Sequence, residues 1–162
     1  MRYLLFISLF YWTYAIADSA MPITIGWVET VRILPEEFEL QAKIDTGADH
    51  SSLGIVDADD FIRDGRQWIR FTVRNNKGRT QVFERPFERS ARIKPKQAAT
   101  LKRPVVNMLL CIDRQMYLTP VNLTERKNFK YQMLIGRSFL QDRFLVSSSS
   151  QLTTHPKCES LK

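Results

Sequence analysis

Residues 38–47 read FELQAKIDTG, and this stretch decides the fold prediction. Its first seven residues alternate apolar and polar side chains, which predicts a strand with its apolar side chains on one buried face. Asp45, Thr46 and Gly47 follow that strand without a gap. We therefore expect the Asp45 carboxylate to emerge at the edge of a sheet, held in place by a packed core.

The sequence on both sides consists of short alternating segments separated by turn residues. Residues 75–78 lie between two such segments, and the Asn and Gly residues there favour a hairpin turn because both tolerate positive φ. A second hairpin is predicted across Asp113 and Arg114, and one helical turn each over residues 57–64 and 137–142. Several short strands with turns between them predict an all-β domain, either a small barrel or a sandwich.

The composition is that of one globular domain, with 162 residues of which 44% are hydrophobic. The formal net charge is +7. A basic surface attracts nucleic acid, anionic lipid or acidic substrates, but here the basic residues are scattered and no aromatic residues interleave with them as stacking platforms. We expect no nucleic-acid partner. Two interpretations stay open: a solvated basic face, or attraction to acidic peptides or an anionic envelope surface.

The N-terminus has the pattern of a secretory signal peptide over residues 1–17. Arg2 precedes an apolar run over residues 4–16, and Ala15-Ile16-Ala17 gives the small-x-small pattern of a cleavage site. An uncleaved membrane anchor, with its aromatic residues at the interface, is the alternative. The prediction is an exported protein, periplasmic or secreted, without a stable membrane span after cleavage.

The folded domain is expected over residues 22–147, followed by a tail over residues 148–162. Cys111 lies in an apolar run of the domain and Cys158 lies in the tail. Export permits a disulfide between them, whereas a buried free thiol at Cys111 would be equally ordinary. The pairing therefore stays open.

The motif Asp45-Thr46-Gly47 is short, and its residues also favour a simple Asx-type turn at the end of a strand. Its surroundings make it more specific. Residues 44–49, IDTGAD, resemble the active-site segment of the retropepsins, the single-domain aspartic peptidases typified by retroviral proteases. Residues 133–137, MLIGR, resemble their second signature, in which apolar residues precede a Gly-Arg pair that opens a short helix. Both motifs occur in the order and at the spacing of that family.

The resemblance implies a closed acid-protease barrel with one short C-terminal helix, and a role for each matched residue. Asp45 would be the catalytic acid, with Thr46 bracing it and Gly47 letting the backbone approach the substrate closely. Asp49 would form an ion pair with Arg137 that ties the active-site loop to the helix. The other matched residues, expected in substrate binding or structural support, are Ala48, His50 and Gly136.

A narrower resemblance covers about residues 25–146 and is to a bacterial retropepsin-like family, some of whose members are labelled ATP-dependent zinc protease. The segments that carry it are residues 26–29, 68–71, 103–106 and 133–140. The label finds no support in the sequence. It has no Gly-x-x-x-x-Gly-Lys-Ser/Thr loop and two histidines in total, whereas a catalytic zinc site uses three protein ligands as a rule. We expect no metal and no cofactor.

Peptide hydrolysis by this chemistry uses two carboxylates about 3 Å apart that share one proton. The sequence contains one Asp-Thr-Gly and no second Asp-Ser/Thr-Gly, so the second carboxylate has to come from Asp45 of another copy. The prediction is an aspartic endopeptidase that cleaves peptide or protein substrates as a homodimer. The alternative is a non-catalytic envelope protein that binds peptides or partners on the same scaffold. The hairpin that would cover a substrate stays open between the tip at residues 75–78 and the basic segment 85–103.

Overall fold

The computed structural model describes residues 21–93, 101–126 and 129–159. The signal peptide predicted over residues 1–17 lies outside these residues, as does the part of the basic segment between residues 94 and 100. Strands make up 62% of the structure, and the described residues contain one short helix. The prediction of a mainly β domain is confirmed.

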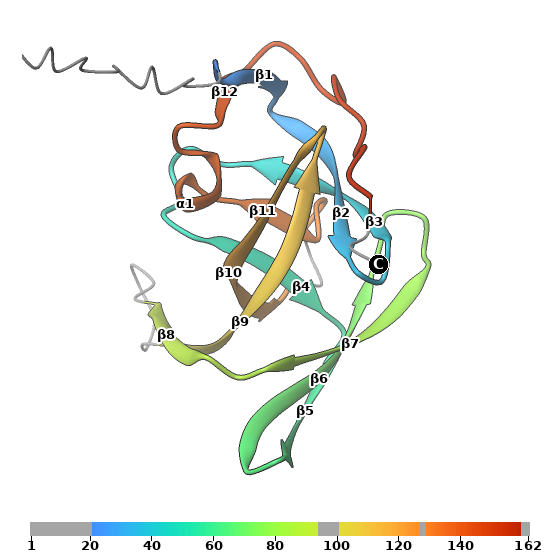
Figure 1. Cartoon of the computed structure of the whole chain (residues 1–162), viewed down its shortest axis with the longest axis vertical. Coiled ribbons are helices and arrows are strands. Elements are labelled where there is room, and N and C mark those ends of the chain that lie inside the picture. Colours follow the sequence, from blue (N-terminus) through green and yellow to red (C-terminus); the bar gives the residue numbers. More distant parts are fainter. Residues whose placement is uncertain (1–20, 94–100, 127–128, 160–162) are drawn as a thin grey trace, which may run out of the picture.

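Six strands form a closed barrel, in the order β10, β4, β11, β3, β2, β9 and back to β10 (Figure 1). Their bounds are β2 (Val28–Leu34), β3 (Phe38–Ile44), β4 (Ser51–Ile55), β9 (Leu101–Ile112), β10 (Gln115–Glu125) and β11 (Met133–Ile135). Inward-facing side chains from these strands form one hydrophobic core. The expected closed barrel is therefore present, and the sandwich is excluded.

Strand β3 shows how the alternating pattern becomes a barrel wall. Phe38, Leu40, Ala42 and Ile44 are buried while the residues between them are not, as a strand with one face toward a core requires. β3 pairs antiparallel with β2 on one side and parallel with β11 on the other. The end of β3, and with it Asp45, is fixed from both sides.

Strand β11 brings the two sequence motifs together. It lies between β3 and β4, parallel to the first and antiparallel to the second. The helix α1 (Arg137–Leu140) begins one residue after Gly136, which directly follows β11. Because β3 and β11 run in the same direction, their C-terminal ends meet at the same edge of the barrel. That edge carries both Asp45 and Gly136.

A separate three-stranded sheet, β5 (Asp57–Arg63), β6 (Arg66–Arg74) and β7 (Thr80–Pro86), extends from the barrel (Figure 1). The helical turn expected over residues 57–64 is wrong, because this segment is a strand that pairs with β6 through a turn at Asp64 and Gly65. Both turn residues have positive φ, as a two-residue hairpin turn requires.

Aromatic side chains join this sheet to the barrel. Phe83 lies between Phe38 of the barrel and Phe71 of the sheet, with ring centroids 5.8 and 5.6 Å from its own. All three side chains are fully buried. Aromatic contacts of this kind add to the stabilisation from burial alone, so the extra sheet is anchored in the main core.

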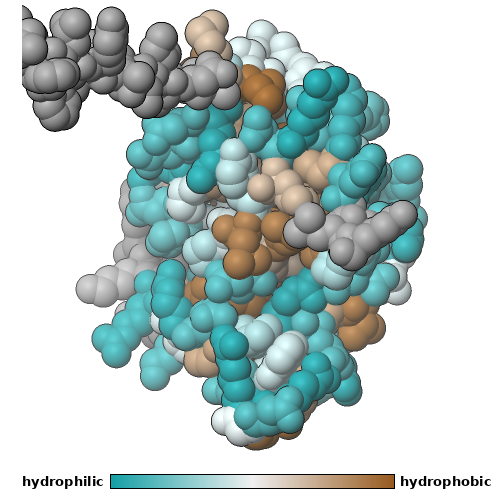
Figure 2. All heavy atoms as spheres, in the orientation of Figure 1, coloured by the Kyte–Doolittle hydropathy of each residue, from teal (hydrophilic) through white to brown (hydrophobic). Residues whose placement is uncertain are grey.

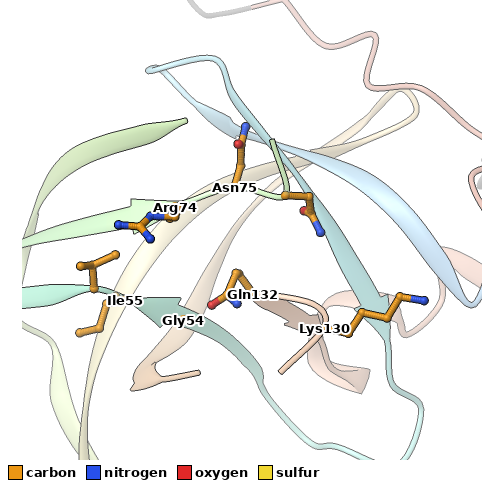
Figure 3. A pocket seen from close by; sticks show the side chains of 8 residues that line it. Gly54, Ile55, Arg74, Asn75, Lys130 and Gln132 are labelled. Carbon is orange, nitrogen blue, oxygen red and sulfur yellow. The ribbon is translucent and has the colours of Figure 1, made fainter. Parts of the chain in front are cut away.

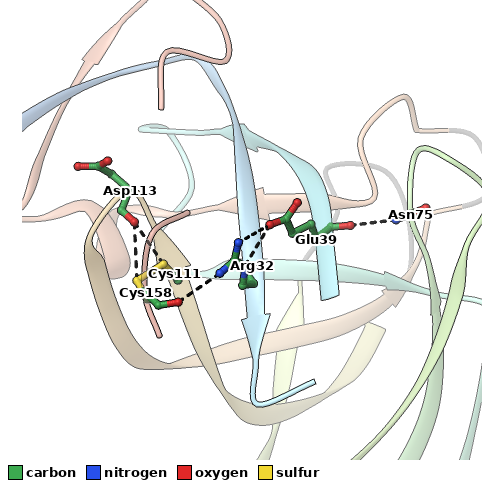
Figure 4. Close-up of polar contacts among 6 residues, drawn as sticks. All are labelled: Arg32, Glu39, Asn75, Cys111, Asp113 and Cys158. Atoms are coloured by element: carbon green, nitrogen blue, oxygen red, sulfur yellow. Dashed lines mark hydrogen bonds and ion pairs between the residues drawn. A yellow bond between two sulfur atoms is a disulfide. The ribbon is translucent and has the colours of Figure 1, made fainter. Parts of the chain in front are cut away.

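After β12 (Phe144–Ser147), residues 148–158 lie against the barrel, and we call this segment the C-terminal strap. β12 pairs in parallel with β1 (Ile23–Gly26). Cys158 forms a disulfide with Cys111, and Arg32 donates a hydrogen bond to the Cys158 carbonyl (Figure 4). The pairing that the sequence left open is therefore a bridge between the strap and β9.

A buried carboxylate holds the middle of the strap. Glu29 is fully buried, and it accepts hydrogen bonds from the backbone and hydroxyl groups of Thr153 and Thr154 and from the Gly26 N–H. Five donors satisfy the charge where water does not reach it. The strap thus depends on one ionised side chain as well as on the disulfide.

The surface seen in Figure 2 is mostly hydrophilic, with hydrophobic residues in several places, most clearly near the centre of the view, over β9 and β10. Among the described residues, the structure contains no helix with the length and hydrophobicity needed to cross a membrane.

Candidate active site

Asp45 begins the loop that joins β3 to β4. Its N–H donates to the Ile135 carbonyl at 2.8 Å, and its Oδ1 accepts a hydrogen bond from the Gly47 N–H at 3.0 Å. The Ala48 N–H donates to the Asp45 carbonyl at 3.2 Å. These bonds make a tight turn and fix the carboxylate, whose side chain is 27% exposed. The carboxylate therefore faces outward from the barrel wall and is open to other molecules.

Arg137 ties this loop to α1. Its guanidinium donates to the Asp49 carboxylate and, at 2.9 Å, to the Thr46 carbonyl. Its backbone N–H donates to the Ala48 carbonyl at 2.9 Å. The Asp49–Arg137 ion pair that the resemblance implied is present. One side chain thus holds the loop on both sides of Gly47.

Gly136 allows the loop and the helix to lie so close. A Cβ atom at this position would lie 2.6 Å from the carbonyl carbon of His50 and 2.7 Å from its oxygen. No side chain fits there without moving the backbone. The Gly136 N–H donates to Ser51 Oγ at 3.2 Å, so the contact is also polar.

The remaining residues of the motif are open to solvent in the single chain. Thr46 and Gly47 are exposed beside Asp45, and His50 is exposed further along the loop. Ala48 is half-buried and contributes its carbonyl to Arg137. All eight residues predicted for the site therefore lie on this loop or at its contact with α1.

A cavity of about 490 Å³ lies beside the loop. Its walls come from the loop, from β4, β10 and β11, and from the hairpin of β8 (Arg89–Ile93) with β9. The lining residues are Ala48, Asp49, His50, Ser52, Arg89, Ser90, Ala91, Arg92, Arg103, Asn122, Arg126 and Leu134. The predicted site residues Ala48, Asp49 and His50 thus open onto a space large enough for side chains of a peptide.

The position of this cavity distinguishes between the two segments that the sequence offered as a cover for a substrate. The β8–β9 hairpin forms one wall of it. The turn at residues 75–78 contributes instead to a second cavity, of about 400 Å³, that no residue of the Asp45 loop lines (Figure 3). Residues 89–92 and 103 of the basic segment, and not the turn at residues 75–78, therefore lie next to the candidate site.

Two cationic residues that interact with Asp45, Lys43 and Arg126, were not among the site residues predicted from the sequence. The Lys43 Nζ lies 3.9 Å from Asp45 Oδ2, and the negative charge of Asp45 acts to raise the pKa of Arg126. Alternation in β3 places Lys43 on the same face as Asp45, so this residue was recognisable from the pattern. Arg126 reaches the site from β10 through the fold alone.

The described residues contain no group of three or more His, Cys, Asp or Glu side chains arranged to hold a metal ion. The two cysteines are joined in the disulfide. The groups at the site are thus the carboxylates of Asp45 and Asp49, several cations and backbone donors, which suit acid–base chemistry.

Comparisons with known proteins agree on the fold, whereas the names of the matching proteins give two different activities. A family model described as retropepsin-like aspartic endopeptidase RimB, RimB-like, matches residues 24–157. A crystal structure of a Legionella pneumophila protein of unknown function is similar with a TM-score of 0.71 and 31% identity, over 82% of this chain and 98% of that one.

The curated relatives carry a different name. Probable alpha-L-glutamate ligases of Desulfotalea psychrophila and Shewanella pealeana are 27% and 26% identical over 115 and 113 residues. These matches cover 69% and 68% of this chain but 25% of each relative. The chain therefore spans about a quarter of the length of the curated relatives that it matches.

Proposed function

The chain belongs to the RimB-like family of retropepsin-like aspartic endopeptidases, and on this premise we propose that it hydrolyses peptide bonds with a dyad formed by Asp45 of two copies. The observation that carries the proposal is the position of Asp45. It is an accessible carboxylate at the end of β3, on a loop that Gly136 and Arg137 hold in place.

The chemistry requires two carboxylates in different protonation states. Like charges about 3 Å apart do not both ionise, so the pair shares one proton. The ionised member removes a proton from a water molecule, which attacks the carbonyl carbon of the scissile peptide bond. The neutral member donates a hydrogen bond to the carbonyl oxygen. When the C–N bond of the resulting tetrahedral intermediate breaks, the proton taken from water passes to the leaving nitrogen, so that an amine and a carboxylic acid are released. One chain supplies one such acid, and a two-fold axis beside Asp45 supplies the second.

The exposure of the motif supports this arrangement. Thr46 and Gly47 face solvent in the single chain. A second copy placed over this edge would bury both residues and bring the two carboxylates together. The bonds from Arg137 to Thr46 and Asp49 hold the loop before the copies meet, so little ordering would remain for the dimer to complete.

The charge around the cavity supports an acidic peptide as the substrate. Arg89, Arg92, Arg103 and Arg126 line it, against one lining carboxylate, Asp49, which is paired with Arg137. The curated relatives are named for alpha-L-glutamate, which is a negatively charged residue. We propose that the peptides cleaved contain glutamate or aspartate near the scissile bond.

Substitution of Asp45 by Asn tests the proposal. The amide is nearly isosteric and its oxygen still accepts the Gly47 N–H, so the fold should persist while cleavage of acidic peptides is abolished. The matched control is Asp64→Asn at the exposed β5–β6 turn, where Asn also tolerates the positive φ. Peptide cleavage followed by mass spectrometry, together with the midpoint of thermal unfolding, measures both effects.

Full activity of the Asp45→Asn variant would remove this residue from the mechanism. A folded chain that binds peptides at any pH but cleaves none would favour the alternative, a peptide-binding protein without catalysis on the same scaffold.

A further inference from the structure

The cavity beside the Asp45 loop has an excess of positive charge. Its four arginines come from two strands and a loop, with Arg89 and Arg92 on β8, Arg103 on β9 and Arg126 directly after the end of β10. Within the described part of the chain, none of these guanidinium groups is in ion-pair contact with a carboxylate. Elsewhere on this protein exposed arginines do pair with acids, for example Arg70 with Glu84. The cavity thus concentrates cations that lack anions.

Arg126 is the most firmly held of the four. Its Nη2 donates to Ser52 Oγ at 2.6 Å and its Nη1 to the Tyr131 carbonyl at 3.5 Å. The guanidinium carbon also lies 4.9 Å from the centre of the Phe129 ring, within the range of a cation–π contact. The side chain is therefore fixed in one orientation where it lines the cavity.

The hydrogen-bonding capacity of Arg126 is not used up. A guanidinium has five N–H donors, and the bonds to Ser52 and Tyr131 account for two of them. Nε is buried and, among the described residues, is the one buried side-chain nitrogen or oxygen without a hydrogen-bond partner. A buried donor without a partner costs free energy unless something binds it. Nε itself has almost no accessible surface, so the donors left for a ligand in the cavity are the remaining N–H groups on Nη1 and Nη2.

The electrostatics of Arg126 agree with the geometry. Burial lowers the pKa of Arg126, the positive charge of Arg103 lowers it further, and the charge of Asp45 acts in the opposite direction. The cationic form is thus held in a place that disfavours positive charge. An anion in the cavity would offset both the free-energy cost of burying the guanidinium charge and its repulsion from Arg103.

We infer that Arg126 is a specificity-determining residue, which binds the side-chain carboxylate of a glutamate or aspartate of the bound peptide, with Arg103 as its second cation. The inference rests on the proposed function and adds the residue that recognises the negative charge of the peptide. A carboxylate matches the planar fork of a guanidinium better than any neutral side chain does. Ser52 orients that fork, and Asp45 stays free for chemistry.

The experiment measures binding without hydrolysis, so that it stands apart from the peptidase question. The full chain with Asp45→Asn is the parent, and the probes are short peptides that differ only by glutamate against glutamine at one position. Fluorescence titration gives the ratio of the two dissociation constants. We compare the parent with a version that also carries Arg126→Gln. The matched control is Arg114→Gln, an exposed arginine at the β9–β10 turn outside the cavity.

The parent and the control should bind the glutamate peptide more tightly than the glutamine peptide. Arg126→Gln should weaken binding of the glutamate peptide by about tenfold or more, as expected for loss of a charge-assisted hydrogen bond, and should leave the glutamine peptide nearly unchanged. If Arg126→Gln fails to fold, Arg103→Gln should reduce the same ratio by a smaller factor.

Equal weakening for both peptides would mean that Arg126 only supports the wall, and it would overturn the inference. So would a parent that binds the two peptides equally or binds neither. A chain that prefers glutamate through Arg126 but cleaves nothing when Asp45 is intact would keep the inference and reject the peptidase.

Discussion

The Arg137 side chain contacts the loop after Asp45 at two points, and the resemblance of two short motifs to the retropepsins was enough to predict one of them. The ion pair with Asp49 was expected, whereas the hydrogen bond to the Thr46 carbonyl was not. A sequence motif identifies side chains that can pair, but it does not indicate which backbone carbonyl a side chain will reach. Arg126 shows the other limit, because it meets Ser52 across 74 positions of sequence. Only the closed barrel brings those two residues together.

The Arg137 side chain should matter for activity and little for stability. The ion pair is exposed, at 51% for Arg137 and 73% for Asp49, and exposed pairs contribute less than about 1 kcal/mol. Loss of the bond to Thr46 would however let the loop shift. We expect Arg137→Gln to lower kcat by about 10- to 100-fold, because small misplacements of catalytic groups have effects of that size.

Peptide cleavage rates and denaturant unfolding of the same preparation check this prediction. Arg70→Gln, which removes another exposed ion pair on the extra sheet, serves as the control and should change neither quantity appreciably. A large loss of stability without a loss of kcat in Arg137→Gln would show that the loop holds its geometry by other means.

At the scale of elements, alternation predicted the strands that face the core and failed for the one that does not. β3 and β6 each have one buried face, which the alternation in the sequence reports directly. β5 is exposed along nearly all its length, so its residues show no alternation, and its acidic residues before Gly65 resembled a helical turn. Its partner is β6, and pairing rather than burial makes it a strand.

The C-terminal strap makes stability depend on pH through Glu29. Burial alone would raise the pKa of Glu29, but hydrogen bonds from Thr153, Gly26 and Thr154 outweigh burial and lower the pKa below its usual value. A carboxyl group with a lowered pKa in the folded state stabilises that state fully above its unfolded pKa of about 4.3. This contribution is lost as the pH falls through the folded pKa.

We therefore expect the unfolding free energy of the wild type to decrease below about pH 4 more steeply than that of Glu29→Gln. At neutral pH the variant should be less stable by about 1–3 kcal/mol, since its amide leaves buried donors unsatisfied. Denaturant titrations over a series of pH values provide both quantities. Parallel pH curves for the two proteins would exclude Glu29 as the group responsible.

The disulfide should contribute a comparable amount by a different route. It joins residues separated by 47 positions, and closure of a loop of that length restricts the unfolded chain by about 4 kcal/mol in the chain-entropy model. The double variant Cys111→Ser, Cys158→Ser should lower the unfolding free energy by about that amount. Reduction of the wild type should have the same effect, and an unchanged unfolding midpoint under reducing conditions would contradict the prediction.

At the scale of the whole molecule, the strand pattern left a barrel and a sandwich open and the family resemblance predicted the barrel, whereas nothing in the sequence predicted the cavity beside the Asp45 loop. Closure of β10 onto β9 was implied by the hairpin predicted across Asp113 and Arg114. The cavity needs β8 to lie across the edge of the barrel next to the Asp45 loop, and no local pattern encodes that approach. The assembly of two copies is a further step that rests on chemistry, because one chain carries one Asp-Thr-Gly motif.

Mixing of subunits tests that step most directly. Wild-type chains and Asp45→Asn chains are combined in equal amounts, allowed to exchange, and assayed at a fixed total concentration. If each active unit needs Asp45 from both copies, about a quarter of the dimers retain the dyad, and the activity should be about a quarter of that of the wild type. An activity of about one half would mean that each chain works alone, and it would contradict the shared dyad.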